Sequence, residues 1–85
     1  MPMRVAIVSP EQEVWSGDAD MVVARTVEGD IGVLPGHVPM LAVLVRDQVV
    51  RVKVGSQEIS AGVDGGFLSV TKEGVSILAE SATVA

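Results

Sequence analysis

The chain has 85 residues, of which 48% are hydrophobic, and its 11 acids and 6 bases give a net charge of −5. A nucleic-acid-binding domain would carry a basic face, so this charge argues against a nucleic-acid partner. The absence of cysteine excludes a disulfide framework, thiol chemistry and thiolate metal sites, and the length indicates one domain, residues 1–85.

The first third of the chain shows a hydrophobic period of two, which is typical of β-strands. Residues 3–8 predict a first strand, which ends at the following Ser-Pro pair, and residues 14–16 predict a short second strand. Residues 21–27 are apolar on both sides, which predicts a strand covered on both faces. The N-terminal residues contain one base and no long apolar core, so no signal peptide is expected.

Residues 28–41, EGDIGVLPGHVPML, contain three glycines and two prolines, which break a helix and interrupt a long strand. The segment also carries two acids, Glu28 and Asp30, and the only histidine, His37. It is too apolar for a solvated loop, so it either folds under the domain or presents a docking surface.

The second half of the chain predicts further short strands separated by turns. The clearest alternation is at residues 50–54, and a Gly-Ser pair then predicts a hairpin. The predicted strands here are residues 40–45 (buried), 50–54, 59–63, a strand containing Leu68 and Val70, residues 75–79, and a short edge at 82–85. Strands at intervals of about eight to ten residues predict an all-β fold, a small β-sandwich or flattened barrel.

Catalytic chemistry is not predicted. Serine, histidine and aspartate all occur, but there is no G-x-S-x-G elbow, and His37 lies between Gly36 and Pro39 without a neighbouring acid. Asp30 would repel a phosphate from the glycines around it, and one histidine without cysteine is a poor metal site. The residues alone indicate a non-catalytic β module without cofactor or metal, whose high apolar content hints at an obligate partner.

The run EGDIGVLPGHVP resembles the signature loop of the epsilon subunit of the F-type ATP synthase, called delta in mitochondria. Three further blocks agree in order, namely IVSPEQEVWSG, GGFLSV and GVSILAESA. The resemblance spans nearly the whole chain and covers the family's N-terminal β domain. It implies a β-sandwich of about ten short strands, without the C-terminal helical hairpin of most members and without the ATP-sensing and inhibitory states that depend on it.

The resemblance implies a non-catalytic rotor subunit that couples the gamma subunit to the membrane c ring during ATP synthesis driven by proton transport. It implies peripheral attachment, through the complex, to the cytoplasmic side of the bacterial inner (plasma) membrane. Asp30 matches the family's acidic position that meets a basic residue of the c ring. The implied c-ring contacts are Glu28, Asp30, Ile31, Val33 and Leu34, and the implied contacts at the junction of gamma and c ring are Ser9, His37, Val38, Met40 and Ala42.

Two other readings remain open from the residues. Lipoyl and biotinyl carrier domains are also small and all-β, and they present a modified lysine at a hairpin tip, where Lys72 is predicted to lie. The Met or Asp expected beside such a lysine is missing. An unrelated β module that forms oligomers is the second alternative.

Overall fold

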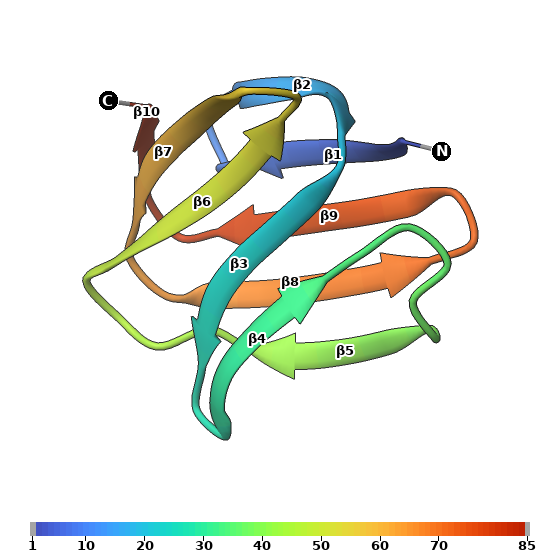
Figure 1. Cartoon of the computed structure of the whole chain (residues 1–85). Coiled ribbons are helices and arrows are strands. Elements are labelled where there is room, and N and C mark those ends of the chain that lie inside the picture. The colour runs from blue at the N-terminus through green and yellow to red at the C-terminus, as the bar shows by residue number, and fades with distance from the viewer. Residues whose placement is uncertain (1, 85) are drawn as a thin grey trace.

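The computed structural model describes residues 2–84, which form ten β-strands joined by short turns (Figure 1). The strands are β1 (Met3–Val8), β2 (Glu13–Ala19), β3 (Met21–Thr26), β4 (Gly29–Val33), β5 (Met40–Val43), β6 (Gln48–Val54), β7 (Gln57–Val63), β8 (Gly66–Thr71), β9 (Gly74–Ala79) and β10 (Ala82–Val84). Within these residues no helix is long and apolar enough to cross a membrane.

The ten strands form two five-stranded sheets. Sheet A has the order β2-β1-β9-β8-β5, and sheet B has the order β10-β7-β6-β3-β4. All neighbouring strands are antiparallel except β1 and β9, which run parallel. Sheet B crosses in front of sheet A in Figure 1, with side chains packed between the two layers. The prediction of an all-β sandwich with about ten short strands is therefore confirmed.

The core lies between the sheets and is built almost entirely from valine, isoleucine, leucine and alanine. Every second residue of a strand points to the same face, so the period of two in the sequence places one side of each strand inside. Trp15 is only partly buried and packs against the margin of this core. The buried hydrophobic residues are Val5, Ile7, Ala19, Val22, Ala24, Val33, Ala42, Leu44, Val50, Val52, Ala61, Val63, Leu68, Val70, Val75, Ile77 and Ala79.

The structure corrects three of the predicted strands. The second strand, β2, begins one residue before the predicted residues 14–16 and ends three residues after them. In β3 only one face is covered, because Arg25 is exposed while Ala24 is buried. The predicted buried strand at residues 40–45 is the edge strand β5, in which Leu41 is 68% exposed. In β3 and β5, apolar side chains on both faces of the strand therefore do not mean that both faces are buried. Of the predicted edge at 82–85, residue 85 lies outside the described residues.

Candidate partner-binding site

The segment singled out in the sequence begins with a rigid hairpin between β3 and β4. Thr26, whose side chain is buried, donates a hydrogen bond from Oγ1 to the Gly29 carbonyl at 2.8 Å. The same oxygen accepts a bond from the Glu28 amide at 3.1 Å. The tip is also tied to sheet A, because the Val27 amide donates to the Val43 carbonyl of β5 at 2.9 Å. The turn therefore holds Val27 and Glu28 out in solvent.

Arg25 and Asp30 are direct cross-strand partners on the outer face of this hairpin. Arg25 Nε donates to Asp30 Oδ1 at 2.9 Å, and both side chains are about two-thirds exposed, at 66% and 69%. An exposed pair of this kind contributes about 0.2–1 kcal/mol to folding stability. Its main effect is to fix where the Asp30 carboxylate lies.

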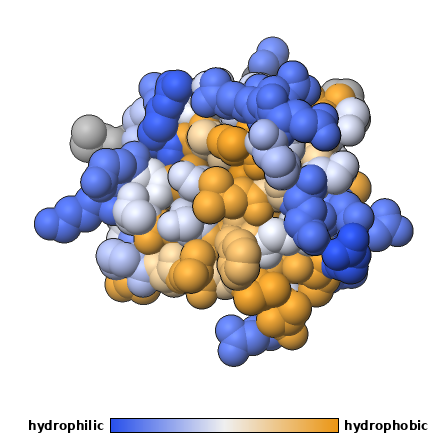
Figure 2. Space-filling view, turned by 180° about the vertical axis from the view of Figure 1, so that it is seen from behind, coloured by the Kyte–Doolittle hydropathy of each residue, from blue (hydrophilic) through white to orange (hydrophobic). Residues whose placement is uncertain are grey.

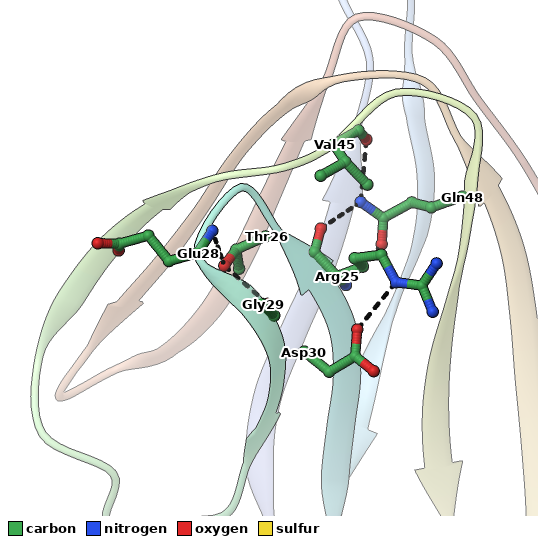
Figure 3. Close-up of polar contacts among 7 residues, drawn as sticks. All are labelled: Arg25, Thr26, Glu28, Gly29, Asp30, Val45 and Gln48. Carbon is green, nitrogen blue, oxygen red and sulfur yellow. Dashed lines mark hydrogen bonds and ion pairs between the residues drawn. The ribbon is translucent and has the colours of Figure 1, made fainter.

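Gln48 holds the backbone of Arg25 at the place where sheet B divides (Figure 3). The pairing of β3 with β6 ends at Val23, and beyond it the Arg25 carbonyl accepts a hydrogen bond from the Val45 amide at 3.1 Å. The Gln48 side chain adds two hydrogen bonds to Arg25: Oε1 accepts from Arg25 N at 2.7 Å, and Nε2 donates to Arg25 O at 2.6 Å. Nε2 also donates to Val45 O at 3.0 Å. One amide side chain thus acts like a peptide group of a neighbouring strand.

Replacing Gln48 with alanine is expected to destabilise the domain by about 0.5–1.5 kcal/mol, because the Arg25 amide loses its acceptor while the Arg25 carbonyl keeps its bond from the Val45 amide. Gln48→Glu is expected to cost more, since a carboxylate would face two carbonyl oxygens. Urea unfolding measures both effects. Gln57→Ala serves as the matched control, because Gln57 is exposed. Equal unfolding midpoints for Gln48→Ala and Gln57→Ala would contradict the bridging role of Gln48.

The structure separates the residues implied as c-ring contacts. Glu28, Asp30 and Leu34 are exposed, and Ile31 is partly buried against the core. Val33 is 0% exposed and pairs across the strands with Val22, so its side chain belongs to the core and cannot form a contact surface. The implied role of Val33 is therefore corrected. The reason is that this part of the segment is a strand, β4, whose alternating side chains point inward.

The residues implied as junction contacts are also divided. Val38 is exposed, and His37 and Met40 are partly buried. Ala42 is only 7% exposed and pairs with Leu68 in sheet A, so its implied contact role is corrected. In β5 the outward positions are those on either side of Ala42.

The loop between β4 and β5 borders a pocket of about 380 Å³. The His37 ring contributes to its wall, with Nδ1 hydrogen-bonded to the Val38 carbonyl at 2.8 Å. Leu34, Val38 and Pro39 line it together with residues from the start of β1 and the β8–β9 turn. Ser9 lies at the other end of β1, beside Leu78, so the structure does not bring Ser9 and His37 together.

The outer face of sheet A carries an apolar row that local sequence patterns did not reveal. The row consists of Val43, Phe67, Leu78 and Val8, which are consecutive cross-strand partners on β5, β8, β9 and β1. Val43, Phe67 and Leu78 are each 46–47% exposed. Figure 2 views this side of the molecule and shows apolar surface across its middle with polar groups around the margin. Leu41 adds a further exposed apolar side chain beside this row.

The outer face of sheet B has a different character. Arg25, Arg51 and Lys53 are exposed on it, with Asp30 and Glu58 at the flanking positions of the neighbouring strands. The outer face of sheet A therefore has an apolar row, whereas the outer face of sheet B carries more charged side chains. Among residues 2–84 there is no group of three His, Cys, Asp or Glu side chains that could hold a metal ion.

Residues 2–85 match the β-sandwich domain of the delta/epsilon chain of ATP synthase. The chain belongs to the ATP synthase delta/epsilon family. It is 76% identical to the ATP synthase epsilon chain of Frankia casuarinae over 82 residues, which cover 96% of both chains. It is 53% identical to the epsilon chain of Mycobacterium tuberculosis, with 94% of this chain and 67% of that one covered. The family resemblance of the sequence is thereby confirmed.

Solved structures agree on the fold of this delta/epsilon chain. A chain of the Euglena gracilis mitochondrial ATP synthase superposes with a TM-score of 0.89 at 23% identity, covering 98% of this chain and 53% of that one. A chain from the central stalk and c ring of the Tetrahymena thermophila enzyme gives a TM-score of 0.77 at 18% identity, covering 96% of this chain and 66% of that one. This chain therefore spans about half to two thirds of those proteins.

The epsilon chain is a non-catalytic subunit of ATP synthase. The family match over residues 2–85 also favours this assignment over a lipoyl or biotinyl carrier and over an unrelated oligomer-forming module. Lys72 is an exposed residue of the β8–β9 turn, which is a common place for a lysine in any antiparallel hairpin.

Proposed function

We propose that this domain is a part of the ATP synthase rotor that couples the gamma subunit to the c ring during ATP synthesis driven by proton transport. The proposal rests on the presence of two separate surfaces on one β-sandwich, namely the apolar row of sheet A and the β3–β4 hairpin. The similarity to a chain of the Tetrahymena central stalk and c ring supports it. Residues 1–85 are proposed to act as a single domain in this role.

The apolar row is the proposed gamma contact. Covering about 400 Å² of apolar surface contributes roughly 10 kcal/mol before the costs of association, at about 25 cal/mol per Å². The charged face of sheet B would be expensive to cover in the same way, because its ions would lose water. Gamma is therefore expected on sheet A, with sheet B toward solvent.

The edge of the sandwich formed by β4 and β5 is the proposed c-ring contact. Leu34 supplies exposed apolar surface there, and Ile31 adds a partly exposed side chain. Asp30 and Glu28 supply negative charge for the basic residue of the c-ring loops. The hydrogen bond from Val27 to Val43 joins this edge to sheet A, so a load on the hairpin passes into the gamma-facing sheet. His37 and Val38, at the far end of β4, would border both partners.

The proposed location is the cytoplasmic side of the bacterial plasma membrane, where the domain is held peripherally through the complex. The close relatives in Frankia and Mycobacterium are bacterial. No nucleic-acid contact is proposed.

The direct test of this function is light scattering after size exclusion, with the domain alone and mixed with the gamma subunit of the Frankia enzyme. We expect a complex of one domain with one gamma subunit. A domain that forms homo-oligomers and ignores gamma would contradict the proposal and support an oligomer-forming module.

Changing the charge of Asp30 is expected to weaken coupling. Asp30→Asn removes an attraction of about 0.2–1 kcal/mol, whereas Asp30→Arg adds a repulsion of similar size. Proton pumping by reconstituted membranes should therefore fall further with Asp30→Arg. Glu58→Arg is the matched control, since Glu58 is also an exposed acid but lies on β7 of sheet B, away from the hairpin. Equal pumping by Asp30→Asn and Asp30→Arg would rule out the proposed contact.

A further inference from the structure

The carboxylate expected to meet a cationic partner is already engaged within the domain. Asp30 Oδ1 accepts a hydrogen bond from Arg25 Nε, and the structure gives Oδ2 no protein partner among residues 2–84. The Arg25–Asp30 pair is neutral overall, so the net negative charge of the hairpin comes from Glu28, and position 30 presents a dipole. One carboxylate oxygen remains available to a partner.

Arg25 is itself well placed, and it is not the only cation nearby. Its backbone is bound on both sides by the Gln48 amide, which fixes the point from which the side chain extends. On the outer face of sheet B, Arg51 of β6 pairs with Val23 of β3, and Arg51 lines the same shallow pocket as Arg25 and Asp30. If position 30 lost its negative charge, the positive charges of Arg25 and Arg51 would no longer be compensated at this edge.

We propose that Arg25 is a specificity-determining residue of the c-ring contact, an inference that rests on the function proposed above. Arg25 pins one oxygen of Asp30 and leaves the other for a single cationic side chain. Its terminal amino groups can at the same time donate to a carbonyl beside that cation. The preferred partner loop therefore presents a lysine or arginine next to a free backbone or side-chain carbonyl.

This arrangement has a consequence that a merely structural ion pair lacks. In Asp30→Asn, Arg25 loses its counter-charge and repels the partner's cation. Removing Arg25 as well relieves that repulsion, so the double variant Arg25→Gln with Asp30→Asn should bind better than Asp30→Asn alone. Because the wild-type Arg25–Asp30 pair is neutral, binding of the domain through this pair should depend only weakly on salt concentration. Arg25→Gln leaves the Asp30 charge uncompensated, so it should make the salt dependence of binding steeper.

The test is a double-mutant cycle measured by binding to the detergent-solubilised c ring of the Frankia ATP synthase with its gamma subunit attached. Asp30→Asn is expected to bind least, and the double variant about two- to fivefold more tightly than Asp30→Asn, the range that exposed charge pairs give. The cycle of Lys53→Gln and Glu58→Gln, at exposed cross-strand partners of sheet B away from the hairpin, should leave binding unchanged. A double variant that binds no more tightly than Asp30→Asn overturns the role of Arg25.

A measurement on the free domain tests the Arg25–Asp30 pairing independently of any binding to gamma or the c ring. Wild-type protein that fails to bind the gamma–c-ring assembly would contradict the proposed function. The pairing on which the inference depends is then judged by nuclear magnetic resonance of the Arg25 Nε proton. Its exchange with water should be slower in the wild type than in Asp30→Asn, and equal exchange would overturn the inference.

Discussion

Replacing Phe67 with aspartate is expected to abolish binding to the gamma subunit, with a loss of affinity of at least about 100-fold. Phe67 is the central aromatic member of the apolar row, between Val43 and Leu78. Truncating a central aromatic anchor commonly costs about 2–4 kcal/mol, and a buried unpaired carboxylate adds a further penalty. Titration calorimetry with gamma measures the loss.

The fold itself should tolerate this change, because Phe67 is 46% exposed and lies outside the core. Val49→Asp is the matched control: Val49 is 50% exposed, but on the outer face of sheet B. We expect its affinity for gamma to change less than about threefold, as for most residues outside an interface core. An equal or larger loss for Val49→Asp would contradict the assignment of gamma to sheet A.

Replacing Gly66 with alanine is expected to give one of the two largest losses of stability of any single methyl addition, together with Gly74, where a Cβ would lie 2.0 Å from the Arg4 carbonyl oxygen. Gly66 has φ +112°, and a Cβ there would lie 2.0 Å from the Leu78 carbonyl oxygen. The backbone strain and the forced separation of β8 from β9 together should cost roughly 3 kcal/mol or more. The whole domain is expected to be stable by about 5–10 kcal/mol, so the variant should still fold but unfold at a clearly lower urea concentration than the wild type.

Gly55→Ala separates the steric effect from the conformational one. Gly55 also has a positive φ, +60°, but a Cβ there would meet nothing within 4 Å. Its expected cost is about 1–2 kcal/mol, the usual penalty for the left-handed conformation. Urea unfolding midpoints compare the two variants, and a lower midpoint for Gly55→Ala than for Gly66→Ala would contradict the steric role of Gly66.

The strands and the core were largely predictable, because the period of two is a local property of the sequence. At residues 50–54 the valines alternate with Arg51 and Lys53, and the structure places Val50 and Val52 in the core and both bases outside. The outer apolar row was not predictable in this way. It depends on which strands become neighbours and in which register, and β5 and β1 are brought into one row only through β8 and β9.

The candidate site shows the same division between local and long-range information. The Arg25–Asp30 pair follows from the register of a tight hairpin and lies within reach of sequence reasoning. The Gln48 bridge joins residues 23 positions apart, across a split in the sheet, and no local pattern signals it. Val33 was misassigned because residues 28–41 were treated as a loop, in which side chains have no fixed direction. Ala42 was misassigned because its contact role came from the family resemblance, although the sequence placed it in a buried strand at residues 40–45. In strands β4 and β5 their positions dictate burial.

The apolar face of sheet A as the gamma-binding surface is the central claim, and thiol labelling tests it most directly. The chain has no cysteine, so single Ser69→Cys and Ser60→Cys variants can be labelled with a maleimide without background. Ser69 lies on the outer face of sheet A and Ser60 on that of sheet B, and both are partly buried. In the complex with gamma, we expect Ser69→Cys to be protected and Ser60→Cys to react as in the free domain. Protection of Ser60→Cys with free labelling of Ser69→Cys would contradict the claim.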